Sequence, residues 1–260
     1  MSHLECTLYE EKNSIAWITL NRPEVLNALN RKLWREIYEN LERAERNENV
    51  RAIVITGAGR AFCAGDDIKE VFSLKTPGEF EAFFWNFAAP TITKIVSLPK
   101  PVIAAVNGLA YGGGCEIAML CDLVVASKNA TFAIPEALIG AIPPVAAVIG
   151  AFVVGRLNVN WMMMTGEPIS AEEAKRIGLV NEVVPHEELL LAAERMAKAT
   201  MKAAPSSIKA IKKLANLNFN QEKLKKAVEE LINIVQTEEG KEGHKAFIEK
   251  RLPKWAEIEG

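Results

Sequence analysis

Glu116 stands one turn inside a segment whose sequence predicts a helix entered through glycines. The stretch Pro101–Ala126 begins with an apolar, strand-like run, Val102–Val106, and passes through Asn107–Gly108 to three glycines, Gly112–Gly114. Glycines at a helix entrance let main-chain N–H groups approach a ligand closely, and the helix dipole favours negative charge at that end. Glu116 is therefore a candidate for proton transfer beside an anion-stabilising site. A plain strand-to-helix connection with one well-placed carboxylate would have the same sequence.

Two further segments carry groups that complete such a site. The Gly-rich loop Gly57–Asp67 follows a predicted strand, and a second carboxylate, Glu136, follows Thr131–Pro135. Two strand-end glycine loops can each aim one N–H at the same carbonyl oxygen, and each such donor is typically worth roughly 3–4 kcal/mol of transition-state stabilisation. Two carboxylates in apolar surroundings can act as general acid and general base, because burial raises the pKa of a carboxyl group.

Composition narrows the classes of protein. The 260 residues are 49% hydrophobic and 25% charged, which predicts one sizeable globular domain, with or without an appendage. The net charge of -2 provides no basic field for nucleic acid, so a nucleic-acid partner is not expected. The three histidines, His3, His186 and His244, are far apart in the sequence, which argues against a histidine metal site or a Ser-His-Asp triad.

The cysteines and one apolar stretch bear on location. Cys6, Cys63, Cys115 and Cys121 show no CxxC spacing, and no signal peptide is recognised, so we expect reduced thiols and a cytoplasmic protein. The segment Ala137–Gly155 has no charged side chain and is nearly long enough to span a bilayer. Its paired prolines would interrupt a helix near its start, so we expect a buried loop followed by a buried helix, and no membrane partner.

Strands alternate with helices over most of the chain, which predicts an α/β fold with crossover connections. The expected elements are a hairpin of Leu4–Tyr9 and Ile15–Leu20, a helix from the cap Asn30 to Arg46, strand Ala52–Thr56, helix Pro77–Val96, and strands Leu123–Ala126 and Thr131–Ala133. After Val184 only helices are expected, at Glu187–Met201, Pro205–Leu217, Gln221–Gln236 and Glu238–Lys250. This change predicts a catalytic core over residues 1–195 and a C-terminal helical region over residues 196–260.

Taken together, the motifs resemble those of the crotonase superfamily, the enoyl-CoA hydratases and isomerases. The matching segments, in the family's order and over almost the whole chain, are ITLNRPEVLNALN, AFCAGDDIKE, PVIAAVNGLAYGGGCEIAMLCDLVVAS, FAIPEALIGAIP, MTGEPISAEEAKRIGLVNEVVP and EEGKEGHKAFIEKRLPKW. The resemblance implies a ClpP/crotonase fold of repeated ββα units, with a C-terminal helical region that packs at a trimer interface. It also implies a homo-trimer or a hexamer built as a dimer of trimers.

The resemblance further implies an activity and its residues. The oxyanion donors would be the backbone N–H groups of Asp66 and Gly113, and the hydratase carboxylates would be Glu116 and Glu136. An acyl-CoA thioester would be polarised by the two N–H groups, and the glutamates would share the acid and base roles in adding water across the double bond of a 2-enoyl-CoA. No metal or redox cofactor is expected, because CoA is the carrier part of the substrate.

CoA binding is implied for the loop after the second strand, for the loop around the first oxyanion donor and for the chain's C-terminal part. The residues concerned are Glu24, Val25, Ala28, Ala64, Asp67, Ile68, Lys69, Phe247 and Lys250. Lys69 would meet a CoA phosphate as a point charge. Lysines such as these two are more often solvated surface residues, and a phenylalanine such as Phe247 is more often part of a helix core.

Two positions depart from the family pattern. Pro144 stands where glycine is common and has no N–H, so we expect the attacking water to be held differently, and the apolar run Val145–Phe152 to reshape the acyl pocket. Asp66 stands where small residues are frequent, and we expect its side chain to turn outward or to make its own hydrogen bond. The alternatives left open are a double-bond isomerase or another acyl-CoA lyase, and a non-catalytic relative that binds RNA.

Overall fold

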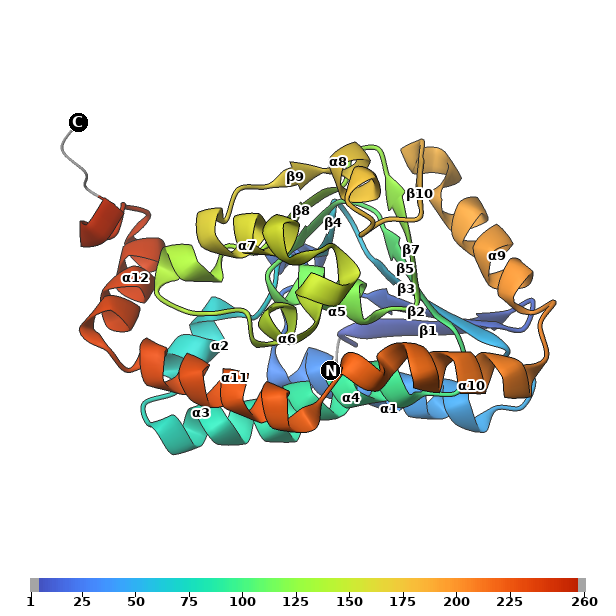
Figure 1. Ribbon diagram of the computed structural model, residues 1–260, viewed down its shortest axis with the longest axis horizontal. Coiled ribbons are helices and arrows are strands. Elements are labelled where there is room, and N and C mark those ends of the chain that lie inside the picture. The colour runs from blue at the N-terminus through green and yellow to red at the C-terminus, as the bar shows by residue number, and fades with distance from the viewer. Residues whose placement is uncertain (1–4, 257–260) are drawn as a thin grey trace.

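Two mixed β-sheets form the centre of the molecule, for which the computed structural model describes residues 5–256 (Figure 1). The large sheet has the strand order β1-β2-β3-β5-β7-β10, and the small sheet has the order β4-β6-β8-β9. The strands are β1 (Thr7–Lys12), β2 (Ile15–Leu20), β3 (Ala52–Gly57), β4 (Ala61–Cys63), β5 (Val102–Val106), β6 (Leu109–Tyr111), β7 (Leu123–Ser127), β8 (Thr131–Ala133), β9 (Ile169–Ser170) and β10 (Glu182–Val184).

Helices surround the two sheets. The α-helices are α1 (Arg31–Arg46), α2 (Ile68–Ser73), α3 (Pro77–Phe83), α4 (Ala89–Ser97), α5 (Gly113–Leu120), α6 (Pro144–Val153), α7 (Arg156–Thr165), α8 (Ala171–Arg176), α9 (Leu189–Thr200), α10 (Pro205–Ala215), α11 (Gln221–Val235) and α12 (Glu238–Glu249). Shorter helical turns are η1 (Pro23–Val25), η2 (Phe84–Ala88), η3 (Glu136–Ile139), η4 (His186–Glu188), η5 (Asn216–Asn218) and η6 (Lys254–Ala256).

The chain alternates between the sheets in a repeated unit. One strand joins the large sheet, the next joins the small sheet, and helices follow: β3 and β4 precede α2 to α4, β5 and β6 precede α5, and β7 and β8 precede η3, α6 and α7. Within each sheet these strands pair in parallel. The predicted α/β fold of ββα units is confirmed. The parallel pairing brings the carboxyl ends of β4, β6 and β8 to one edge of the small sheet, where the expected site residues follow.

Local sequence rules account for the first elements. β1 and β2 pair antiparallel around Asn13 and Ser14, which adopt φ values of 55° and 60°, as a tight hairpin turn requires. The hairpin is therefore confirmed with a shorter turn than expected, and Leu4 lies outside the described residues. Helix α1 begins where predicted, because the Asn30 side chain accepts the N–H of Leu33 at 2.8 Å.

The expected helix Pro77–Val96 contains a wider turn. α3 passes through the π-helical turn η2 into α4, and the N–H of Ala89 donates to the carbonyl oxygen of Phe84, five residues back. Pro90 explains the change, because its ring removes one N–H and crowds the preceding turn of an ordinary α-helix. Phe83, Phe84 and Ala88 line the cavity described below.

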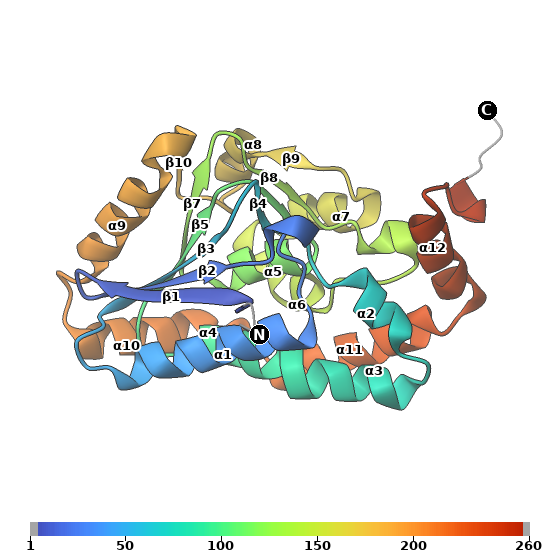
Figure 2. The same cartoon turned by 180° about the vertical axis from the view of Figure 1, so that it is seen from behind.

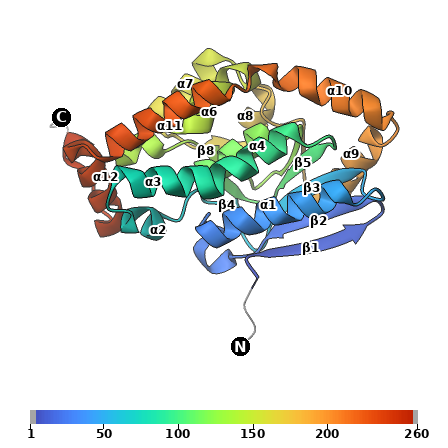
Figure 3. The same cartoon turned by 90° about the horizontal axis from the view of Figure 1, so that it is seen from below.

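The helices after β10 return to the core of the same chain. α9 covers one face of the large sheet by packing on β3, β5 and β7, and Figure 2 shows the same arrangement from behind. α10 and α11 then run along one side of the molecule and place α12 at the end away from α9 (Figure 3). The expected boundary between residues 195 and 196 falls inside α9, so the division into a core and a helical region stays a prediction.

The uncharged segment 137–155 forms η3, a short loop and α6, whose apolar residues are mostly buried. Pro144 occupies the first position of α6, where a missing N–H removes no helical hydrogen bond. Over residues 5–256, no helix combines the length and apolar character that a bilayer crossing requires.

Helix α12 is pressed against η3 through glycine. A methyl group on Gly243 would lie 2.4 Å from the carbonyl carbon of Ile139, whereas one on Gly78 in α3 would meet nothing within 4 Å. Alanine is favoured over glycine in helices by about 1 kcal/mol, but overpacking against rigid backbone typically costs about 1–3 kcal/mol. We expect Gly243→Ala to lower the free energy of unfolding in urea by ~1–2 kcal/mol, and Gly78→Ala to leave it equal or raise it. Equal stability of the two variants would contradict this close contact.

Candidate active site

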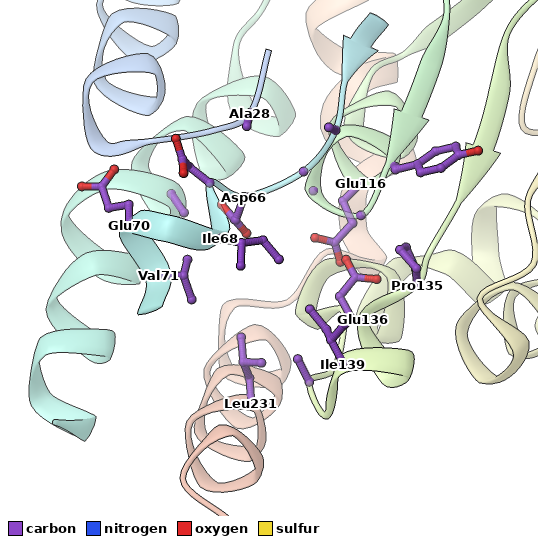
Figure 4. Close-up of a pocket in the computed structure, with 18 of the residues that line it drawn as sticks. Ala28, Asp66, Ile68, Glu70, Val71, Glu116, Pro135, Glu136, Ile139 and Leu231 are labelled. Carbon is purple, nitrogen blue, oxygen red and sulfur yellow. The ribbon is translucent and has the colours of Figure 1, made fainter. Parts of the chain in front are cut away.

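A cavity of about 1130 Å³ lies where β4, β6 and β8 end, and it is closed on the far side by α11 and α12. Glu116, Glu136 and Asp66 all line it. Figure 4 shows Glu116 and Glu136 directing their carboxyl groups toward each other, with Asp66 across the cavity from them. The structure therefore brings together the four expected catalytic positions, since Gly113 also lies on this wall.

The N–H of Asp66 is left unpaired by the way its loop is tied down. Leu29 and Asp66 form an isolated parallel bridge, in which the N–H of Leu29 donates to Gly65 at 2.8 Å and the N–H of Asp67 donates to Leu29 at 3.0 Å. In a parallel bridge the central residue directs its own N–H away from that partner. Within residues 5–256 neither this N–H nor that of Gly113 has a hydrogen-bond acceptor.

The two free N–H groups lie close together because glycines allow it. A methyl group on Gly113 would lie 3.8 Å from the nitrogen of Asp66. Gly65 has φ +92° and Gly112 has φ +51°, in the region that favours glycine. A methyl group on Gly112 would also lie 2.8 Å from Oε1 of Glu136. The arrangement can present two main-chain donors to one oxygen atom beside a carboxyl group.

Glu116 is buried in the first turn of α5 and is held by the start of α6. Its Oε1 accepts the N–H groups of Val145 at 2.9 Å and Ala146 at 2.8 Å. Burial raises the pKa of Glu116 to about 7, against the lowering effect of these two hydrogen bonds. Although Pro144 has no N–H, Glu116 still accepts two main-chain hydrogen bonds, because Val145 and Ala146 donate both of them.

Glu136 begins η3, immediately after the loop that follows β8. Its Oε2 is buried and has no hydrogen-bond partner among the described residues. Burial, together with the nearby Glu116 carboxylate, raises the pKa of Glu136 well above its usual value. An unpartnered oxygen on a carboxyl group that favours its neutral form is suited to donate a proton to a bound molecule.

Of the two outcomes expected for the Asp66 side chain, turning outward or making its own hydrogen bond, the structure shows the hydrogen bond. The indole N–H of Trp34 donates to Asp66 Oδ1 at 3.1 Å. The carboxyl group is exposed to the cavity rather than turned away from it. The surrounding protein nevertheless raises the pKa of Asp66 to about 6, chiefly by excluding water, although the Trp34 hydrogen bond acts in the opposite direction.

Most of the residues expected to bind CoA surround the same cavity. The cavity-lining members of that set are Val25, Ala28, Ala64, Asp67, Ile68, Lys69, Phe247 and Lys250. Glu24 is exposed in η1 and does not line the cavity. Phe247 and Lys250 come from α12 and its C-terminal cap within the same chain. Their contacts with CoA stay a prediction.

The apolar wall differs from the one expected. Of Val145–Phe152, only Val145 lines the cavity, and Phe152 is 58% exposed on another face of α6. The apolar lining comes mainly from other elements, among them Phe80, Phe83, Phe84, Ile68, Val71, Ile139, Leu231 and Val235. In Figure 4, Ile68, Val71, Ile139 and Leu231 surround the space below the carboxyl groups. The expected wall was wrong because the other side chains of α6 face the core or the protein surface.

Comparison with known proteins decides the family. A model described as enoyl-CoA hydratase/isomerase matches residues 10–258. The chain belongs to this family, the crotonase superfamily. A probable mitochondrial enoyl-CoA hydratase of Dictyostelium discoideum is 36% identical over 250 residues, covering 95% of this chain and 89% of that protein.

Solved structures agree with the crotonase fold. An enoyl-CoA hydratase/isomerase from Pseudoalteromonas atlantica T6c gives a TM-score of 0.86 at 30% identity, covering 96% of this chain and all (100%) of that one. A carnitinyl-CoA hydratase from Mycobacterium avium gives a TM-score of 0.85 at 36% identity, covering 98% of this chain and 99% of that one. The chain is thus a crotonase-family enzyme. A cytoplasmic location stays a prediction, as one relative is mitochondrial by name.

Some groups of the site were not anticipated from the sequence. In the sequence, Trp34 looks like another apolar residue on the buried face of α1. The one hint of a polar role is that a buried indole N–H usually needs a hydrogen-bond partner. The donors of Val145 and Ala146 are main-chain atoms, for which side-chain motifs carry no signal. Leu231 and Val235 lie on a helix whose return to the cavity depends on tertiary packing.

The raised pKa of Glu136 makes a prediction for stability. Below the ordinary carboxyl pKa both folded and unfolded chains hold this proton, whereas above that pKa, and until the raised pKa of the folded chain is reached, only the folded chain keeps it. The free energy of unfolding therefore falls with rising pH in this window, by at most ~1.4 kcal/mol per pH unit. Glu136→Gln removes this titration, so the stability of the variant relative to the native protein should rise from pH 5 to 7 in urea unfolding at fixed protein concentration. The exposed Glu167→Gln variant serves as the control, and a gap that stays constant with pH would contradict the expectation.

Proposed function

We propose that this enzyme is an enoyl-CoA hydratase, which adds water reversibly to a 2-enoyl-CoA to give a 3-hydroxyacyl-CoA. One observation carries the proposal: Glu116 and Glu136 face each other in an apolar cavity, beside the free N–H groups of Asp66 and Gly113. Paired carboxyl groups suit the movement of protons to and from one water molecule. Two main-chain donors suit a thioester oxygen that gains negative charge.

The reaction follows from these groups. The thioester oxygen accepts the N–H groups of Asp66 and Gly113, so that electron density leaves C3 and water attacks there. Glu116 takes a proton from the water, because its two main-chain hydrogen bonds favour the ionised form. Glu136 supplies a proton to C2 as the enolate collapses, because its Oε2 is unpartnered and its neutral form is favoured. The reverse sequence dehydrates a 3-hydroxyacyl-CoA.

The lining of the cavity supports an acyl-CoA as the substrate. Its wall includes Lys69 of α2, Lys250 at the end of α12, and phenylalanines of α3 and η2. A CoA phosphate would pair with the lysines, and an apolar acyl tail would pack against the phenylalanines. The assignment of these subsites belongs to the proposal.

We also expect the enzyme to assemble as a trimer or as a hexamer. Large apolar side chains are exposed on α7 and α10, including Leu157, Trp161, Met164, Ile211 and Leu214. Exposed apolar groups gathered on helix faces are typical of subunit contacts.

Turnover of crotonyl-CoA tests the function, followed as the loss of absorbance of the conjugated thioester. General acid or base groups typically contribute 10²- to 10⁴-fold, so Glu116→Gln and Glu136→Gln should each lower kcat/KM by at least ~100-fold. Glu167→Gln should leave it unchanged. A loss below about tenfold in both active-site variants would contradict their roles as acid and base.

Product analysis separates hydration from double-bond migration. With 2-enoyl-CoA in ¹⁸O-labelled water, we expect a 3-hydroxyacyl product that carries the label at C3. Formation of 2-enoyl-CoA from 3-enoyl-CoA without label, and no hydration of the 2-enoyl compound, would instead assign the enzyme as an isomerase.

A further inference from the structure

Asp66 combines two groups of opposite effect at one position. Its N–H is a proposed donor to the thioester oxygen, while its side chain is a carboxyl group in the same cavity. A methyl group on Gly113 would lie 3.8 Å from the Asp66 nitrogen and 3.7 Å from Asp66 Oδ2. The side-chain charge is therefore near the place where negative charge would develop on the substrate, and like charges at such a distance repel.

Trp34 controls where that carboxyl group lies. Its indole N–H donates to Asp66 Oδ1, and the tryptophan is only 2% exposed within α1. The carbonyl oxygen of Trp34 also accepts the hydroxyl of the buried Thr91 of α4 at 2.8 Å. The donor thus belongs to a packed pair of helices and is not free to follow a moving side chain.

Other charged groups around Asp66 do not take over this role. Arg22 pairs with Asp67 and Arg31 pairs with Glu70, so both nearby guanidinium groups already have carboxylate partners. The other neighbours of Asp66 are acidic. Asp67 and Glu70 oppose ionisation of the Asp66 carboxyl group. Asp66 in turn opposes ionisation of Glu116 and Glu136. Among the described residues, the Trp34 indole is the one side chain that donates a hydrogen bond to the Asp66 carboxyl group.

We propose that Trp34 is a positioning residue for the oxyanion hole: its indole N–H anchors the Asp66 carboxyl group by Oδ1, so that the carboxyl group cannot swing closer to the substrate oxygen, which meets the Asp66 N–H. The inference rests on the proposed acyl-CoA function of the site. It explains how this chain tolerates a carboxyl group at the position of a proposed oxyanion donor. Trp34 itself lines the cavity, and the role proposed for it acts through the Asp66 carboxyl group.

A double-mutant cycle of Trp34→Phe and Asp66→Ala tests the proposal. Trp34→Phe should lower kcat for crotonyl-CoA hydration by about 10- to 50-fold with a smaller change in KM, because the repulsion grows as the oxygen gains charge. On the Asp66→Ala background the same Trp34→Phe change should have less than a twofold effect. Trp17→Phe, on the opposite face of the large sheet, is the matched control and should leave kcat unchanged.

The cycle distinguishes positioning from packing. A general folding defect of Trp34→Phe would persist in the double variant, because both proteins carry the same cavity in α1. An equal loss of kcat on both backgrounds would therefore overturn the proposal, and so would a Trp34→Phe enzyme with native kcat.

Two readouts do not require turnover. Butyryl-CoA, a thioester that cannot be hydrated, should bind Trp34→Phe about 3- to 10-fold more weakly by calorimetry, and this difference should vanish on the Asp66→Ala background. In protein labelled with 5-fluorotryptophan, the Trp34 ¹⁹F resonance should titrate with pH in the native chain and not in Asp66→Ala.

An enzyme that fails to hydrate crotonyl-CoA but shows both effects would refute the hydratase function and retain the role of Trp34. Hydratase activity without either effect would retain the hydratase function and refute the role of Trp34.

Discussion

The first turn of α6 is the constraint on which the site depends. Two main-chain N–H groups there hold one oxygen of Glu116, a buried carboxylate with no cationic partner among the described residues. Hydrogen bonds alone can keep such a group ionised part of the time, because each one favours the charged form against the cost of burial. A lysine or arginine in that place would fix the charge permanently and remove the ability of the carboxyl group to gain and lose a proton near neutral pH.

The second carboxyl group is placed by backbone packing rather than by polar contacts. Glu136 begins a single helical turn, η3, and this turn lies between Gly112 on one side and the glycines of α12 on the other. Methyl groups on Gly112 or Gly243 would meet Glu136 or the Ile139 backbone at less than 3 Å. Because close-packed backbone yields little, the carboxyl group stays near Glu116 despite the repulsion between the two. The free energy lost in this pairing is compensated by the large apolar core around both sheets.

The sequence predicted the elements that carry strong local signals. Glycine spacing and the residue order around Glu116 and Glu136 located the site, and the Asn30 cap and the alternation of strands gave most of the framework. What it did not predict depends on contacts between distant residues. The Trp34–Asp66 hydrogen bond joins residues 32 positions apart, and α6 faces the cavity through Val145 but not through Phe152. The π-helical turn before Pro90 likewise reflects how a long helix accommodates a proline within tertiary packing.

The wall of the cavity combines segments that lie more than 200 residues apart in the sequence. Arg22 and Val25 come from the segment after the first hairpin, whereas His244 and Phe247 come from the last long helix, α12. A growing polypeptide therefore contains Glu116 and Glu136 before it contains the helix that bounds one side of their cavity. The pocket acquires this side only after residues 238–249 have been made, so that a product truncated before α12 would expose the acidic pair more to water.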